Sequence, residues 1–541
     1  MSVQSMNAFI DMKQKEFSLL SEIVKSLSGF VKPVLGILRQ WSTSKEKYFR
    51  PDCFRQVPVV RTNRVLMVLL AMLALGGCAS RPINERITQA DPNTGYRPYL
   101  MMPKRVNNDP GTLFFLAFSG GGTRAAALSY GVLEELRRTE IVIDGQRRRL
   151  IDEVDIITGV SGGSFTALAY ALYGERLFSE YEQRFLKRNV QGELIQRALN
   201  PFNWWKYIGG SAGRSELAAE YYDEILFEGA TYADLLSRQA PVAVANGTDI
   251  STGFRFSFYQ NDFDLLCSDL NKVRLSRAAA TSSAVPVVLS AVTLDNYGGT
   301  CGYEYPPWVR DVAKSEGRIR PSARAVKRYL EMKDFQNSKD RPYIHLVDGG
   351  VADNIGMRGV LETLEAVGAS AAFRGEIGFG AIRRIVVIVV NSRSAPKTDW
   401  DRREDSPGTV DQLLKASGVP IDRYSFETIE LMKDKEEIYG WRRDLAILRA
   451  RLAGATEAEA AATVPFPKLT LHLMDISFDA VKDPAERDRL MSMPTTFVLP
   501  AEDVDLLREA AGQLLRESAD FQSLLGEWGS STRAPGGGNA N

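Results

Sequence analysis

The chain has 541 residues, long enough for one large domain or two of medium size. Hydrophobic residues make up 44% and charged residues 25%, as is ordinary for a globular protein, and Lys+Arg and Asp+Glu are equal at 67 each. This balance excludes the global basic excess that indicates nucleic-acid binding, so no nucleic-acid partner is expected.

Residues 1–78 are expected to form a leader that ends in a lipoprotein signal peptide. Arg61 and Arg64 precede the apolar run Val65–Leu75, which is too short to cross a bilayer and has the length of a signal-peptide core. The run leads into Leu-Gly-Gly-Cys at 75–78, which resembles the lipobox of bacterial lipoproteins, where the cysteine is acylated and becomes the new N-terminus. The alternative is a buried apolar segment with a chance cysteine.

The lipobox resemblance also implies a location. Ala79, and not Asp, follows Cys78, which by that resemblance favours the outer membrane of a Gram-negative cell. A bacterial cell-envelope protein, held at the membrane surface by an N-terminal lipid, is therefore expected. The residues before Arg61 would make an unusually long n-region, which indicates either a true translation start near 59–60 or a genuine long leader.

The rest of the chain divides by composition. Residues 79–110 are polar, with prolines and asparagines but no periodicity, and predict a tether. Residues 111–528 alternate strand-like and helix-like pieces, which predicts an α/β fold with a mainly parallel sheet, with inserts at about 296–341 and 395–465. The tail, 529–541, is disordered by composition. Expected strands are 113–118, 154–158, 242–245, 254–258, 343–347, 385–390 and 469–476.

Three successive glycines, Gly120, Gly121 and Gly122, follow the first expected strand and precede a helical pattern. Such a turn bares backbone N–H groups beside the positive end of a helix dipole, where a negative charge is stabilised. The same stretch fits the dinucleotide fingerprint G-x-G-x-x-G/A, with an acidic residue, Asp144, about twenty positions later. A P-loop is excluded because no Lys-Ser/Thr pair follows the glycines.

Two stretches match the G-x-S-x-G pattern of an exposed nucleophilic serine, one at Ser161 and one at Ser211. Ser161 lies between an expected strand and an expected helix, as such an elbow requires. Ser211 follows an aromatic stretch without that order and is read as a loop serine. Ser161 is therefore the predicted nucleophile.

A nucleophilic serine needs a base, and the chain has two histidines, His345 and His472. The order Ser161, Asp348, His472 fits a hydrolase triad formally, but His472 lies in mid-strand, where a structural histidine is expected. Asp348 closes an expected strand at its carboxyl end, where ligands bind in open α/β sheets. A plain Asp-Gly turn is the alternative for this residue.

The glycine stretch 120–124, the elbow 159–163 and the turn 348–350 resemble, in order, the signatures of patatin-like phospholipases. Residues 276–292 resemble a further block of that family. The resemblance implies a three-layer α/β sandwich and a Ser–Asp dyad without histidine, with Ser161 as nucleophile and Asp348 as base. It also implies an oxyanion hole at Gly120, Gly121 and Gly122 with Arg124 as partner. Ala125 departs from the family, which usually has glycine there.

The activity implied by this resemblance is serine acyl hydrolysis of phospholipid or lysophospholipid esters, without metal or cofactor. A catalytically silent envelope lipoprotein that binds lipid or a partner is the alternative, and a Ser-Asp-His esterase is a further one. Of the four cysteines, Cys53 would leave with the leader and Cys78 would carry lipid. Cys267 and Cys301 are then a disulfide candidate in an oxidising envelope, or two unrelated thiols.

Overall fold

The computed structural model describes residues 81–532 except 106–107, 144, 201–212, 287, 315–322, 370–374, 376–378, 397, 399, 465–468 and 529–530. All of these residues belong to one compact unit that begins at Cys78. Its centre is an eight-stranded sheet in the order β10-β9-β1-β4-β5-β8-β7, with β6 paired to β5.

The sheet is mainly parallel, as the sequence predicts. Its parallel strands are β1 (Thr112–Phe118), β4 (Ile156–Val160), β5 (Val242–Asp249), β9 (Arg384–Asn391) and β10 (Thr470–Ser477). Antiparallel pairs join β5 to β6 (Phe254–Ser257) and to β8 (Tyr343–Asp348), and join β8 to β7 (Val292–Asp295). A small second sheet holds β2 (Thr139–Ile143), β3 (Gln146–Arg149) and β11 (Ser531–Thr532).

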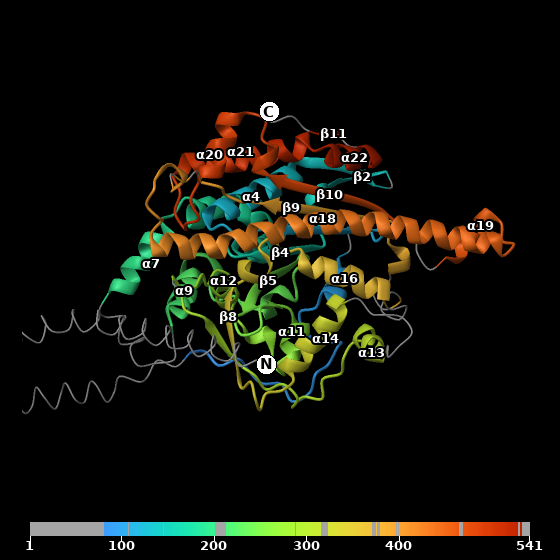
Figure 1. Cartoon of the computed structure of the whole chain (residues 1–541), viewed down its shortest axis with the longest axis horizontal. Helices are drawn as coiled ribbons and strands as arrows, with labels where there is room; N and C mark the ends of the chain where they lie inside the picture. Colours follow the sequence, from blue (N-terminus) through green and yellow to red (C-terminus); the bar gives the residue numbers. More distant parts are fainter. Residues whose placement is uncertain are drawn as a thin grey trace, which may run out of the picture. The chain divides into compact units, whose positions relative to one another are not determined.

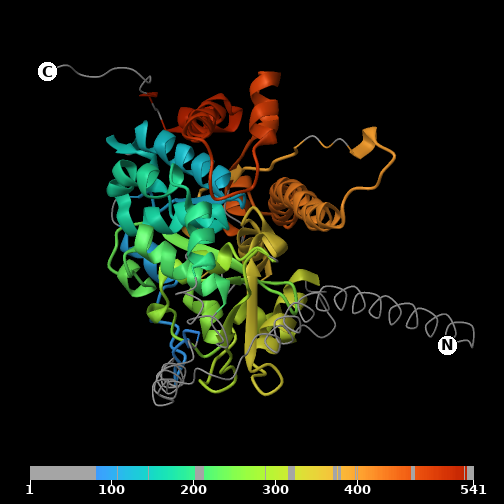
Figure 2. The same cartoon turned by 90° about the vertical axis from the view of Figure 1, so that its left-hand side faces the viewer.

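Helices cover both faces of the sheet, which gives the expected three layers (Figures 1 and 2). Side chains alternate along β1: Phe114, Leu116 and Phe118 belong to one core, whereas Phe115 and Ala117 belong to the other. The first core includes α4 (Thr123–Arg138), α5 (Gly162–Tyr173), α12 (Leu275–Ser282) and α21 (Ala501–Glu517). The second core includes α16 (Arg358–Ala369) and α18 (Thr409–Leu452).

The remaining α-helices are short or lie at the margins of these layers. They are α3 (Pro98–Met101), α6 (Leu177–Tyr181), α7 (Val190–Leu199), α9 (Arg214–Tyr222), α10 (Tyr232–Leu235), α11 (Gln260–Leu265), α13 (Pro307–Lys314), α14 (Ala323–Phe335), α15 (Gly350–Asp353), α19 (Glu457–Thr463), α20 (Pro484–Ser492) and α22 (Ala519–Glu527). The predicted inserts thus contain α13 and α14 in the first and α18 and α19 in the second. Among the described helices, none combines the length and apolar character that a bilayer span needs.

The segment expected to be a tether is packed on the domain in its described part. Arg81 forms an ion pair with Asp295 at 2.7 Å, and the buried Arg97 pairs with Asp264 at 2.6 Å. Tyr96 is buried, and its hydroxyl accepts a hydrogen bond from the Ala243 N–H at 2.8 Å. Specific polar contacts therefore fix this segment, and such contacts leave no hydrophobic period in the sequence.

Candidate active site

Ser161 occupies a sharp turn between β4 and α5, as the strand–elbow–helix pattern predicts. Its φ is 48°, an uncommon value for a residue with a side chain. A Cβ added at Gly162 would collide with the carbonyl oxygen of Gly122, so only glycine lets the elbow and the glycine loop approach this closely. Close packing of the two turns therefore holds Ser161 in its strained conformation.

Asp348 reaches the same level of the sheet by a route that the sequence argument did not foresee. The sequence predicted Asp348 at a strand end on the ligand-binding side of a mainly parallel sheet, but β8 is antiparallel to β5, so its carboxyl end would ordinarily lie at the opposite side. However, β5 extends beyond β4: Val160 lies beside Asn246, and Asp348 lies beside Gly247. The end of β8 therefore meets the end of β4 across a single intervening strand.

The Ser161 side chain lies close enough to the Asp348 carboxyl group to lower its pKa. The exposed fractions of Ser161 and Asp348 are 4% and 7%, so both residues are buried. Burial raises the pKa of Asp348 to about 6, although the Gly350 N–H, at 2.7 Å, and Ser161 lower it. A carboxylate with this pKa can accept a proton near neutral pH.

The carboxyl end of α12 joins the two turns that carry Ser161 and Asp348. The backbone N–H of Ser161 donates to the Ser282 hydroxyl at 2.9 Å, and the Gly349 N–H donates to the Ser282 carbonyl at 3.1 Å. The Asp348 N–H donates to the carbonyl of Ala284 at 3.0 Å. Residues 276–292 were recognised by resemblance alone, and this bridging role of Ser282 was missed.

Asn246 forms a second connection, from β5. Its side-chain amide donates to the Thr158 hydroxyl at 2.7 Å and to the Gly159 carbonyl at 3.2 Å, just before the elbow. A Cβ added at Gly349 would collide with the Asn246 carbonyl oxygen, so the aspartate turn lies directly against this residue. The buried Asn246 therefore contacts both turns, a role without a motif in the sequence.

The glycine loop lies beside Ser161. A Cβ added at Gly120 would be 3.3 Å from the Ser161 Cβ, which measures how close the two segments are. The Gly120 N–H donates to the Asn354 carbonyl at 2.9 Å. Gly121 and Gly122 have φ values of 144° and 62°, which residues with a side chain rarely adopt.

Arg124 is buried and anchors this loop to distant parts of the chain. Its guanidinium donates to the carbonyls of Ser392 at 2.8 Å and Met493 at 2.6 Å, and to the Thr495 hydroxyl at 3.1 Å. Burial lowers the pKa of Arg124 to about 10. These contacts indicate a positioning role for Arg124, because they use its donors to tie α4 to the segments after β9 and α20.

Neither histidine lies beside Ser161. His472 is on β10, three strands from β4, or roughly 14 Å at the usual spacing of strands. Its Nε2 is 3.2 Å from a carboxylate oxygen of Glu527. His345 lies on β8 three residues before Asp348, and its Nδ1 is 3.0 Å from the Thr293 hydroxyl. A triad through His472 is therefore not assembled.

The other predicted site residues have different outcomes. Cys267 and Cys301 are joined by a disulfide, with Cα atoms 5.6 Å apart. Cys78 and Ser211 lie outside the described residues. Within the described ranges, no group of three or more His, Cys, Asp or Glu side chains is arranged to hold a metal ion.

The family model described as patatin-like phospholipase matches residues 116–361. A search of curated proteins gave no match.

Solved structures of human GIVD cytosolic phospholipase A2 are among those similar to the chain. One of these structures is 12% identical to this chain, with a TM-score of 0.36. The match covers 79% of this chain and 65% of the phospholipase chain, so this chain spans slightly less than two thirds of that protein. VipD from Legionella pneumophila is 10% identical, with a TM-score of 0.21, and covers 80% of this chain and 71% of its own.

The family match spans the glycine loop, the elbow, the end of α12 and the aspartate turn, all of which converge in the structure. The patatin-like phospholipase match over residues 116–361 therefore supports a lipid acyl hydrolase in general.

Proposed function

We propose that the protein is a serine acyl hydrolase that cleaves carboxylic esters of phospholipids or lysophospholipids. The observation that carries this proposal is the placement of the Ser161 elbow, at the end of β4, beside the buried Asp348 carboxyl group, at the end of β8. The patatin-like match of residues 116–361 supports lipid esters as the substrate class.

Acylation would begin with transfer of the Ser161 hydroxyl proton to Asp348. The serine oxygen attacks the ester carbonyl carbon and forms a tetrahedral intermediate with a negatively charged oxygen. When the ester C–O bond breaks, the leaving alcohol or lysolipid takes the proton from Asp348. The fatty acyl group is then an ester of Ser161.

The glycine loop is proposed to stabilise the tetrahedral intermediate. Because the Gly120 N–H already donates to Asn354, the oxyanion hole is assigned to the N–H groups of Gly121 and Gly122. Arg124 holds the loop in place through its buried hydrogen bonds. Preorganised donors of this kind act without reorganisation during the reaction, which is the source of their large effect.

Deacylation repeats the same chemistry with water as the nucleophile. Asp348 accepts a proton from the water, which attacks the acyl carbon; Ser161 leaves and recovers a proton from Asp348, and the free fatty acid is released. The dyad is thereby restored.

The cellular setting is part of the proposal. Acylation of Cys78 would hold the mature chain at the outer membrane of a bacterial envelope, beside its lipid substrates. The Cys267–Cys301 bond supports an oxidising compartment of this kind. Mass spectrometry of the native protein should find an N-terminus at a diacylated Cys78, and a mature chain that retains residues 1–77 would contradict the anchoring.

The activity is tested by incubating the purified protein with phospholipid and lysophospholipid vesicles and measuring fatty acid release by lipid mass spectrometry. Wild-type protein should release fatty acid, and Ser161→Ala should not. Ser211→Ala is the matched control because it alters the second G-x-S-x-G motif, and it should keep wild-type activity. Equal release by wild type and Ser161→Ala, or none by wild type, would contradict the proposal.

A further inference from the structure

The carboxyl-terminal part of α18 carries a row of apolar side chains exposed to solvent. Their exposed fractions range from 38% to 81%; the residues are Ile438, Trp441, Leu445, Leu448 and Leu452. We call this set the α18 stripe. Large apolar side chains gathered along one face of a helix indicate a surface that binds a partner.

The spacing of the stripe alternates between three and four residues. At 100° per residue its members fall within about 80° of the helix circumference, opposite Met432, which is buried in the core under α18. This narrow row corresponds to the a and d positions of a two-stranded coiled coil, with Ile438 at a and Trp441 at d. The stripe therefore faces away from the domain that α18 covers.

The stripe lies at the end of α18 remote from the site. The helix follows β9 and precedes the parallel strand β10. It therefore runs from the carboxyl ends of the parallel strands, where Ser161 lies, toward their amino ends. Its 44 residues span about 66 Å, whereas the eight residues of β9 span about 26 Å. The last turns of α18 therefore extend past the strands, with α19 at their end (Figure 1).

Charges flank the stripe in a pattern that selects a partner. Glu437 and Asp444 occupy g positions, and Arg442 and Arg449 occupy e positions; all four are exposed. In a parallel pair of such helices, each g residue meets the e residue five positions later in the other helix. Glu437 then meets Arg442, and Asp444 meets Arg449, so both kinds of contact join opposite charges. An antiparallel pair would place e residues together, which brings arginines together.

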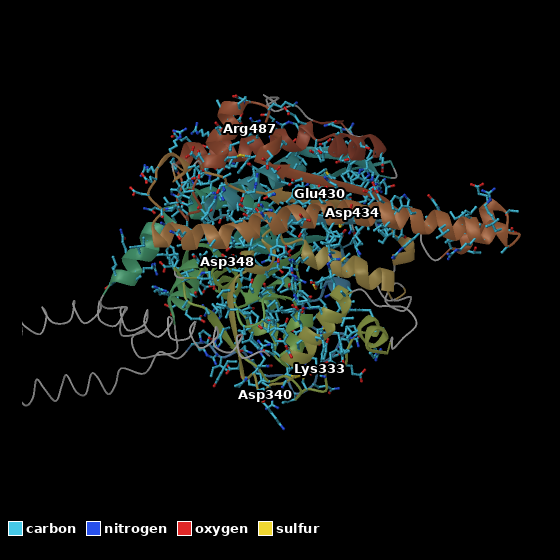
Figure 3. All side chains as sticks on the ribbon, in the orientation of Figure 1. Lys333, Asp340, Asp348, Glu430, Asp434 and Arg487 are labelled. Carbon is cyan, nitrogen blue, oxygen red and sulfur yellow. A yellow bond between two sulfur atoms is a disulfide. The ribbon has the colours of Figure 1, made fainter. Side chains whose placement is uncertain are left out.

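We propose that the α18 stripe binds the same stripe of a second copy of this chain, as a short parallel two-stranded coiled coil. A lipid surface fits the stripe less well, because the helix face continues into acidic residues, including Glu430 and Asp434 (Figure 3). The stripe also lies beyond the amino ends of the parallel strands, on the side of the sheet opposite Ser161. A bilayer in contact with the stripe would therefore not be the one that offers substrate to Ser161. Parallel pairing leaves both catalytic edges open and directed the same way.

The proposal is tested with the full-length protein in mild detergent, by sedimentation velocity over a range of concentrations. Wild type should form a concentration-dependent dimer, and Leu445→Glu with Leu448→Glu should weaken dimerisation about tenfold or more. Phe426→Glu is the matched control, because Phe426 is a 62% exposed apolar residue of the same helix outside the stripe. It should leave the dimer intact, and thermal unfolding should be unchanged in both variants.

Two further variants test the direction of pairing. Leu445→Cys should give a disulfide-linked dimer under mild oxidation, since a-position residues meet their own counterparts in a parallel coil, and Phe426→Cys should not. Arg442→Glu with Arg449→Glu should weaken the dimer, and adding Glu437→Arg with Asp444→Arg should restore it. These measurements require no enzymatic activity, so their outcome does not depend on the proposed hydrolase function.

Several results would overturn the proposal: a wild-type monomer at all concentrations, equal loss of dimer in Phe426→Glu, or failure of the charge exchange to restore pairing. Flotation with phosphatidylethanolamine–phosphatidylglycerol vesicles is measured on the same proteins. A monomeric wild type whose vesicle binding is lost in Leu445→Glu with Leu448→Glu would assign the stripe to lipid and contradict self-association.

Discussion

The backbone N–H of Ser161 donates a hydrogen bond to the hydroxyl of Ser282, with 2.9 Å between nitrogen and oxygen. The carbonyl of the same Ser282 accepts from the Gly349 N–H, next to Asp348. One residue of α12 therefore fixes the backbone on both sides of the Ser161–Asp348 contact. Since Ser161 has a strained φ, the loss of this anchor should change the geometry of the nucleophile more than the fold.

Ser282→Ala should lower kcat about 10- to 100-fold with little change in KM, because the Ser161 N–H loses its acceptor and the nucleophile is less well placed. Steady-state hydrolysis of a soluble short-chain ester measures both constants. Ser283→Ala is the matched control, since the neighbouring hydroxyl bonds the Ala279 carbonyl within α12. Equal loss of kcat in the two variants would show that general damage to this helix end, and not the contact with Ser161, is responsible.

The rate should depend on the ionisation of Asp348. Burial raises its pKa to about 6, and only the carboxylate can accept the serine proton. kcat/KM should therefore rise about tenfold per pH unit below pH 6 and become constant above it. A soluble ester assayed between pH 4.5 and 8.5 gives the profile, and a plateau that continues down to pH 4.5 would exclude a carboxylate base of this pKa.

Asp348→Asn should lower kcat about a thousandfold or more and should stabilise the fold at neutral pH. The folded-state pKa of Asp348 lies above its usual value of 3.8, so folding favours the protonated form. The protonated Asp348 therefore stabilises the fold fully below pH 3.8, and this stabilisation is lost as the pH rises through about 6 and the carboxyl group ionises. The amide avoids this loss, and the free energy of unfolding should rise by ~1–3 kcal/mol at pH 7.5 but not at pH 3.5.

Urea unfolding at the two pH values measures this difference. A variant that is inactive and also less stable at pH 7.5 would indicate that Asp348 serves the fold and not the reaction.

The histidines should be dispensable for turnover. His472→Ala and His345→Ala should each keep activity within about threefold of wild type, because the structure places His472 on the far edge strand and His345 beside Thr293. Circular dichroism confirms that each variant is folded before its kcat is measured. A well-folded His472→Ala protein without activity would replace the dyad by a triad.

Periodicity predicted the sheet well where strands are buried on both faces. The expected strand 385–390 corresponds to β9 (Arg384–Asn391), which is buried along nearly its whole length. The expected strand 343–347 corresponds to β8, in which exposed and buried residues alternate at the start. β7 (Val292–Asp295) was missed because it is a four-residue edge strand, too short for a clear alternation. The packing of residues 81–105 was missed because it depends on ion pairs such as Arg97–Asp264, whose partners are far apart in sequence.

The candidate site was predictable only in part. Ser161 is marked by its local motif, and Asp348 by its place before two glycines, but the register that joins them depends on the length of β5. Ser282 and Asn246 have ordinary sequence surroundings, and their contacts with the two turns arise only when β4, β5 and α12 pack together. Long-range hydrogen bonds of this kind leave no periodic signal in the chain.

Labelling with a fluorophosphonate tests the central claim most directly, because this reagent reacts covalently with an activated serine. The account predicts that peptide mass spectrometry of wild-type protein finds the adduct on Ser161, that Asp348→Asn greatly slows labelling, and that Ser211→Ala leaves it unchanged. An unlabelled wild-type protein, an adduct on another serine, or labelling that does not depend on Asp348 would contradict the Ser161–Asp348 dyad.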